Sequence, residues 1–196
     1  MYKRLFLALF IAMLPISALA GDFTKQHYTS HLGYKIKAPN SWTRVDAATI
    51  EAMKNNLPQN IDSSSVQRFD VIFFPSAKDN TKSDFVPTIS VLGLAEKPAS
   101  MSQETIEAYA DAITQSIPKK LSDIKDFKIV SSIMEPLSGG DAQIHQFTFT
   151  HKDRSLTVEQ AIIINKEHTF VITCTQDSAK VDSQICHTVF NSIKVQ

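Results

Sequence analysis

The C-terminal block of the chain decides the fold that the sequence predicts. It consists of Leu156-Thr-Val-Glu-Gln-Ala-Ile-Ile-Ile-Asn165, then His168-Thr-Phe-Val-Ile-Thr-Cys-Thr175, then a run that ends in Val189-Phe-Asn-Ser-Ile193. The first two stretches are rich in β-branched residues and are separated by a short polar segment, which is typical of a β-hairpin. The third stretch predicts a closing helix, because apolar residues recur at helical spacing at Val181, Ile185, Val189 and Ile193.

Two turns set the register of the strands in and before this block. A two-residue turn at Lys152-Asp153 places Gln146 opposite Glu159 and Thr148 opposite Thr157, and a turn at Lys166-Glu167 places Glu159 opposite Cys174. Side chains alternate between the faces of a strand. One face therefore collects Phe147, Phe149, Leu156, Val158, Ile162, Ile164 and Val171. The other collects Ala161, Ile163, Phe170, Ile172 and Cys174 and ends in Gln146, Thr148, Thr157 and Glu159. Both faces are apolar over part of their length, so we expect a sheet that is covered on two sides.

The rest of the chain alternates predicted strands and helices. Apolar alternation predicts strands at 27–30, 34–38, 68–74, 85–94, 128–134 and 142–150, and helical spacing predicts helices at 47–57 and 102–117. We expect Pro118 to end or bend the second helix, and Pro87 to place its strand at an edge or to delay its pairing. Trp42 is expected to anchor a loop on the core. Consecutive strands with short turns predict an α+β chain, a three-layer α/β/α sandwich around a mainly antiparallel sheet.

The beginning of the chain has the pattern of an export signal. Lys3 and Arg4 precede an apolar run from Leu5 to Leu14, and Ala18-Leu19-Ala20 has the small residues that a signal peptidase accepts. We therefore expect residues 1–20 to be a cleaved signal peptide and residues 21–196 to form a single domain. Without its leader the chain keeps 18 of 20 basic and all 20 acidic residues, a net charge of −2. This balance argues against nucleic-acid binding, and the mature sequence has no run apolar enough to span a membrane. The predicted location is periplasmic or secreted.

The two cysteines, Cys174 and Cys186, are predicted to lie on adjacent packed elements. Disulfides form in exported proteins, and no third cysteine competes, so we expect these two to be paired. The alternative is two buried thiols in the core. A metal site is not expected, because two sulfur ligands need further ligands and only His187 is next to either cysteine.

No stretch of the sequence carries a catalytic signature. The chain lacks the GxSxG, P-loop and GxGxxG patterns, and its six histidines have no HExxH spacing. We therefore assign no catalytic, cofactor-binding or metal-binding residue. His145, opposite Gln160, is the best candidate for a buried polar contact. Gln146, Thr148, Thr157 and Glu159 are a tentative binding surface beside the last helix, with a solvated end of the sheet as the alternative.

Two segments resemble the PsbP/Mog1-like family. Tyr34-Lys-Ile-Lys-Ala-Pro-Asn-Ser-Trp42 is similar to the tyrosine-x-isoleucine, proline and tryptophan opening of these proteins, and the strand Phe170–Thr175 followed by a helix closing on Phe190-Asn-Ser-Ile193 is similar to their ending. The resemblance implies an α/β/α sandwich around an antiparallel sheet. Family members include an extrinsic photosystem II subunit, a nuclear-transport cofactor and exported bacterial proteins, which act mostly as accessory or binding modules. The matched positions are packing and turn residues, and fold alone does not transfer function.

The leading hypothesis is an exported, non-catalytic binding or accessory protein. Its partner would be a protein or small ligand in the cell envelope or outside the cell. Two alternatives remain open at this point: a small secreted hydrolase whose site is built from residues distant in sequence, and a secreted factor that acts on a host or neighbouring cell.

Overall fold

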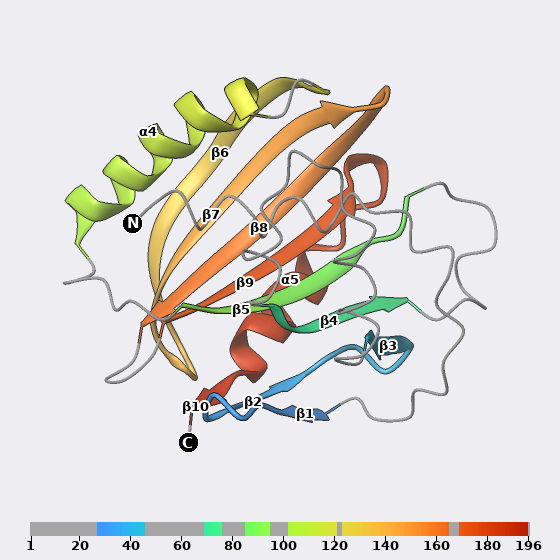
Figure 1. Cartoon of the computed structure of the whole chain (residues 1–196), viewed down its shortest axis with the longest axis vertical. Helices are drawn as coiled ribbons and strands as arrows, with labels where there is room; N and C mark the ends of the chain where they lie inside the picture. The colour runs from blue at the N-terminus through green and yellow to red at the C-terminus, as the bar shows by residue number, and fades with distance from the viewer. Residues whose placement is uncertain are drawn as a thin grey trace.

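The structure of this chain is a computed structural model that describes residues 27–45, 69–75, 85–94, 102–120, 123–164 and 169–195 (Figure 1). The predicted signal peptide, the predicted helix at 47–57 and the predicted turn at Lys166-Glu167 lie outside the described residues.

A seven-stranded sheet forms the centre of the molecule (Figure 1). Its strand order is β3-β4-β5-β9-β8-β7-β6, and every neighbouring pair is antiparallel. The strands are β3 (Trp42–Val45), β4 (Phe69–Pro75), β5 (Thr88–Leu94), β6 (Ile124–Leu137), β7 (Gly140–His151), β8 (Arg154–Ile164) and β9 (Thr169–Asp177). A second, three-stranded antiparallel sheet has the order β1-β2-β10, with β1 (His27–Thr29), β2 (Tyr34–Lys37) and β10 (Lys194–Val195).

The predicted register of β7, β8 and β9 is confirmed. Gln146 pairs with Glu159, Thr148 with Thr157, and Glu159 with Cys174. Lys152 and Asp153 form the first turn, and both have positive φ angles (47° and 62°), as tight hairpin turns with two central residues in the left-handed region require. Because the turn is short, it fixes the register of β7 against β8. In this register the apolar side chains lie on the faces that the alternation predicts.

Each face of the large sheet has its own apolar cluster. Helix α4 (Gln103–Lys120) covers one face through Tyr109, Ile113 and Ile117, which pack over Phe147, Phe149, Leu156, Val158, Ile162 and Val171. Helix α5 (Ser183–Ser192) and the small sheet cover the other face, with Val189, Phe190, Tyr34 and Ile36 over Ala161, Ile163, Phe170 and Ile172. Figure 1 shows α4 along the β6 side of the sheet, whereas α5 lies near the small sheet.

Several local predictions differ from the structure. Trp42 is buried as expected, but it begins strand β3 instead of ending a loop, because the segment after it pairs with β4. Of the two effects expected of Pro87, the delayed pairing is confirmed, because β5 starts at Thr88, and the edge position is wrong, because β5 lies inside the sheet. Helix α4 continues through Pro118 to Lys120.

The closing helix is also shorter than predicted. Val181 precedes α5 and is 39% exposed, so it does not belong to the apolar stripe. The helix begins only after Asp182, whose side chain caps it by accepting from the backbone N–H of Gln184. The cap, and not the apolar period, determines where this helix starts.

Candidate functional site

Helix α5 is held against the sheet by a disulfide and by one buried glutamine. Cys174 of β9 and Cys186 of α5 form a disulfide with their Cα atoms 5.8 Å apart, which confirms the predicted pairing. The side chain of Gln176 donates to the carbonyl oxygen of Asp182 (3.1 Å) and accepts from the Asp182 N–H (2.8 Å). The position of α5 is therefore fixed at its first turns, and the sulfur of Cys186 is not available as a nucleophile.

The candidate binding residues lie together on the face that α5 covers. We call Gln146, Thr148, Thr157 and Glu159 the polar fringe. Gln146 and Thr148 are partly exposed, as is Glu159, whereas Thr157 is buried and its hydroxyl is 2.9 Å from that of Ser178. Ser178 belongs to the short helix η3 (Ser178–Lys180), which follows β9. One member of the fringe is thus used inside the fold, and three remain accessible to solvent.

Glu159 is the electrostatically unusual member of the polar fringe. Its Oε1 atom is buried and has no hydrogen-bond partner among the described residues. Burial raises the pKa of Glu159, and the charge of His187 on α5 lowers it in part. His187 also lies near a second carboxylate, with Nε2 3.7 Å from Oε1 of Glu135 on β6. Glu159 is therefore partly exposed as a residue, whereas its Oε1 atom is enclosed by the fold.

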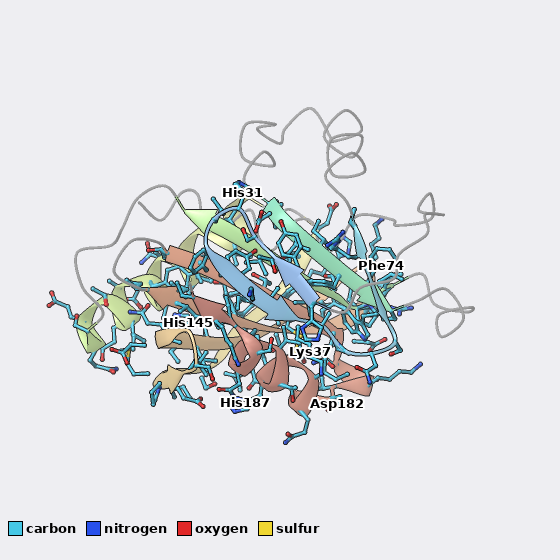
Figure 2. The ribbon with its side chains drawn as sticks, turned by 90° about the horizontal axis from the view of Figure 1, so that it is seen from below. His31, Lys37, Phe74, His145, Asp182 and His187 are labelled. Carbon is cyan, nitrogen blue, oxygen red and sulfur yellow. A yellow bond between two sulfur atoms is a disulfide. The ribbon has the colours of Figure 1, made fainter. Side chains whose placement is uncertain are left out.

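A groove runs along the opposite side of α5, where the helix faces the loop that joins β2 to β3. Its volume is about 250 Å³. Its lining is mainly apolar and includes Ala38, Pro39 and Asn40 from the loop and Ile185, Thr188 and Val189 from α5. The hydroxyl of Ser192 joins the two walls, because it accepts from the N–H of Lys37 (3.0 Å) and donates to its carbonyl oxygen (3.1 Å). Figure 2 shows Lys37 close to α5, in the same view as Asp182 and His187.

Sequence reasoning did not find this groove. Its two walls are far apart in the chain, with Lys37 and Ser192 separated by 155 positions. Taken alone, one wall is explained as a turn and the other as a helix surface. The proline and asparagine after β2 indicated a loop, but no pattern within the sequence indicates which helix that loop faces.

A second cluster that the sequence did not predict surrounds Asp70 on β4. The side chain of Asp70 is 2% exposed. It accepts hydrogen bonds from the hydroxyls of Tyr28 (2.9 Å) and Tyr34 (2.5 Å), and Nδ1 of the exposed His31 lies 3.4 Å away. Asp70 is the extra residue of a β-bulge between Phe69 and Val71, and a bulge changes the direction in which a side chain points. The cluster ties the small sheet to the large one.

A row of buried polar side chains crosses the sheet beneath α4. Tyr109 of α4 donates to Oε1 of Gln160, and Gln160 donates to Thr173 (3.0 Å). His145 pairs with Gln160 in the register, as predicted, and its Nδ1 is 2.9 Å from the Ser132 hydroxyl. Burial lowers the pKa of His145 to about 4, so its ring is neutral at pH 7. This row is enclosed in the core and is structural.

The described residues form neither a metal-binding cluster nor a membrane-spanning helix. Within the described ranges, no group of three or more His, Cys, Asp or Glu side chains is placed to hold a metal ion. None of the helices in those ranges is both long and apolar enough to cross a membrane. The features that remain accessible are the polar fringe and the groove, which flank α5 on its two sides.

Comparisons with known proteins identify a fold. No protein-family model matches the chain, and no curated protein matches it either. Among solved structures, cyanobacterial PsbP from Synechocystis sp. PCC 6803 is similar with a TM-score of 0.59 and 15% sequence identity, over 93% of this chain and 100% of that one. The Ran-binding protein Mog1p of Saccharomyces cerevisiae is similar with a TM-score of 0.52 and 12% identity, over 89% and 96% of the two chains. These likenesses confirm the resemblance seen in the sequence: the chain has the PsbP/Mog1-like fold.

Proposed function

We propose that this chain is an exported, non-catalytic accessory protein that binds a partner protein in the groove beside α5. The observation that carries the proposal is the groove itself, whose mainly apolar lining also includes polar side chains such as Asn40 and Thr188. Its volume, about 250 Å³, is below the range of about 300–1,000 Å³ that is typical of sites for small molecules. A space of this size suits one or two side chains of a protein partner, inserted as an anchor.

The groove is rigid enough to serve as a preformed site. Its helical wall is held by the Cys174–Cys186 disulfide and by the two hydrogen bonds of Gln176, and its loop wall is tied to α5 through Ser192. A preformed surface loses little conformational entropy when a partner binds. In this proposal the polar fringe on the other side of α5 supplies a second contact, through the partly exposed side chains of Gln146, Thr148 and Glu159.

We also propose that the chain is exported and that it forms a three-layer α/β/α sandwich. The basic and apolar leader at residues 1–20, together with the disulfide, supports a protein that works in the cell envelope or outside the cell. The three-layer α/β/α sandwich is supported by α4 on one face of the large sheet and by α5 on the other, where the small sheet completes the layer. Mog1p is described as a Ran-binding protein, which makes protein binding compatible with this fold.

The proposal is tested by blocking the groove without disturbing the core. Thr188 is exposed and lines the groove, so Thr188→Arg fills it with a long cationic side chain. Thr114→Arg is the matched control, because Thr114 is exposed on α4, on the other face of the sheet. Wild-type protein and both variants are used to capture partners from envelope and culture-supernatant fractions, and the captured protein is then purified for affinity measurements.

We expect the wild type and Thr114→Arg to bind the same protein with equal affinity, and Thr188→Arg to bind it at least about tenfold more weakly, a difference of about 1.4 kcal/mol. Equal binding by Thr188→Arg would place the contact elsewhere. Turnover by the purified wild type in a hydrolase panel, without any captured partner, would contradict a non-catalytic role. Glu159→Gln reports on the fringe separately, since it changes the charge without changing the shape.

A further inference from the structure

Strand β6 presents an open edge with exposed apolar side chains. It is the last strand of the large sheet, and among the described residues only β7 pairs with it. The edge is long, from Ile124 to Leu137. Val130, Ile133 and Met134 on this strand are 52%, 48% and 41% exposed, and they account for three of the four exposed large hydrophobic residues in the described part of the chain. An exposed apolar edge strand is a template for pairing with another strand.

The faces of β6 follow from its register with β7. Lys128 pairs with Thr148, Ser131 with Gln146 and Glu135 with Ala142, which places all three on the face that α5 covers. Ile129 and Ser132 pair with Phe147 and His145, which places them on the α4 face. Val130 is the extra residue of a bulge, because the register shifts between Ile129 and Ser131.

The side chains of β6 match those of a second copy of β6 when the two strands run antiparallel with Ser132 opposite Ser132. Ser131 then lies opposite Ile133 of the other copy, Ile129 and Val130 together oppose Met134, and Lys128 opposes Glu135. Without the bulge, Lys128 would lie opposite Pro136. The extra residue Val130 shifts the register by one position, so the two residues of every opposed pair lie on the same face. Each contact occurs twice because of the two-fold axis, which produces two Lys–Glu pairs and covers all three exposed apolar residues.

Other features of the strand limit the pairing to its centre. Asp126 has a positive φ angle of 54° next to a second register shift, and Pro136 has no N–H to donate to a ladder. The complementary segment therefore runs from Lys128 to Glu135. A second copy is the occupant that this segment favours, because the antiparallel self-paired register places Lys128 of each copy opposite Glu135 of the other.

We propose that β6 pairs antiparallel with β6 of a second copy of this chain, so that the two seven-stranded sheets become one continuous sheet in a symmetric dimer. The pairing is independent of the groove beside α5, and both surfaces can be used at the same time.

A charge exchange tests the register directly. Lys128→Glu and Glu135→Lys each place like charges opposite one another at two symmetric positions, and the double variant restores opposite charges. Lys125→Glu is the control, because Lys125 is exposed on the same strand but outside the paired segment. Dimer dissociation of the native protein and the variants is measured by sedimentation equilibrium at low salt, with thermal unfolding of each variant recorded alongside.

We expect each single variant to weaken the dimer about tenfold, which corresponds to about 1.4 kcal/mol, and the double variant and Lys125→Glu to stay within about threefold of the wild type. Glu135 also contacts His187, and this contact is lost in both the single variant Glu135→Lys and the double variant. Recovery of dimer affinity in the double variant therefore reports only on the contact between the two copies. A wild type that stays monomeric over the whole concentration series would overturn the proposal. A dimer that is insensitive to both single variants would also overturn it.

Discussion

The hydroxyl of Tyr34, on the small sheet, donates a hydrogen bond of 2.5 Å to Oδ2 of Asp70, on the large sheet. Tyr34 is fully buried, and the Asp70 side chain is almost fully buried, so the contact lies at the boundary where the two sheets meet. Tyr28 occupies the other carboxylate oxygen (2.9 Å). Burial of the carboxylate is acceptable only because both oxygens have donors, which makes this cluster a sensitive point of the fold.

Asp70→Ala is expected to lower the free energy of unfolding by about 2–4 kcal/mol, because two buried tyrosine hydroxyls lose their acceptor. Urea unfolding measures the change. The exposed Asp111 of α4 provides a control, and Asp111→Ala should change stability by less than about 0.5 kcal/mol. A double-mutant cycle with Tyr34→Phe should give a non-zero coupling energy; additive effects of the two substitutions would show that the hydrogen bond does not contribute.

Stability is expected to fall at alkaline pH. Burial, helped by the hydrogen bond to Asp70, raises the pKa of Tyr28 from 10.0 to about 12. Between these two values the folded chain keeps a proton that the unfolded chain releases, so the free energy of unfolding decreases as the pH rises. Tyr28→Phe should make this decrease shallower, and Tyr34, whose pKa burial also raises, accounts for part of the remainder. Identical pH profiles for wild type and Tyr28→Phe would contradict the assignment.

Acid should destabilise the chain through His145. Burial lowers its pKa from 6.5 to about 4, so in this interval the unfolded chain binds a proton that the folded chain does not. The corresponding stability is present above the unfolded value of 6.5 and is lost as the pH falls toward 4; its size is about 3 kcal/mol. His145→Gln should flatten the profile between these two values. NMR titration of the ring is the direct measurement, and a ring that titrates near 6.5 in the folded protein would rule out this origin.

The disulfide should contribute about 3 kcal/mol, because it closes a short loop between residues 12 apart in the sequence. We expect urea unfolding of the Cys174→Ala/Cys186→Ala variant to give a free energy of unfolding that is lower by that amount. Peptide mass spectrometry without reduction should find the two cysteines linked. The native protein and the variant should become equally stable once the native protein is reduced, and a difference that persists would mean that the substitutions act through packing.

Much of the fold could be predicted because its information is local. The turn at Lys152-Asp153 sets one register for β7 and β8, and alternation then assigns Phe147 and Val158 to one face and Ala161 to the other. Predictions failed where pairing partners come from elsewhere in the chain. Trp42 begins a strand because β4 lies beside it, and nothing near Trp42 in the sequence indicates that neighbour.

The candidate sites also differ in whether local sequence could predict them. The polar fringe could be predicted because Gln146, Thr148, Thr157 and Glu159 share a face within one hairpin. The Asp70 cluster could not, because the alternation that points Tyr34 inward does not say which carboxylate it meets. The groove could not be predicted either, since its walls join at Ser192 and Lys37.

The residue pattern predicted most of the strands, the faces and register of the C-terminal hairpins, and the placement of Cys174 and Cys186 on adjacent elements, because short turns and a period of two act between near neighbours in the chain. Three features became visible only in the folded chain: where α5 starts, what its two sides face, and that β6 ends the sheet with exposed apolar side chains. The physical reason is that these features depend on contacts between segments that are distant in the sequence. Such contacts form only when the whole chain packs.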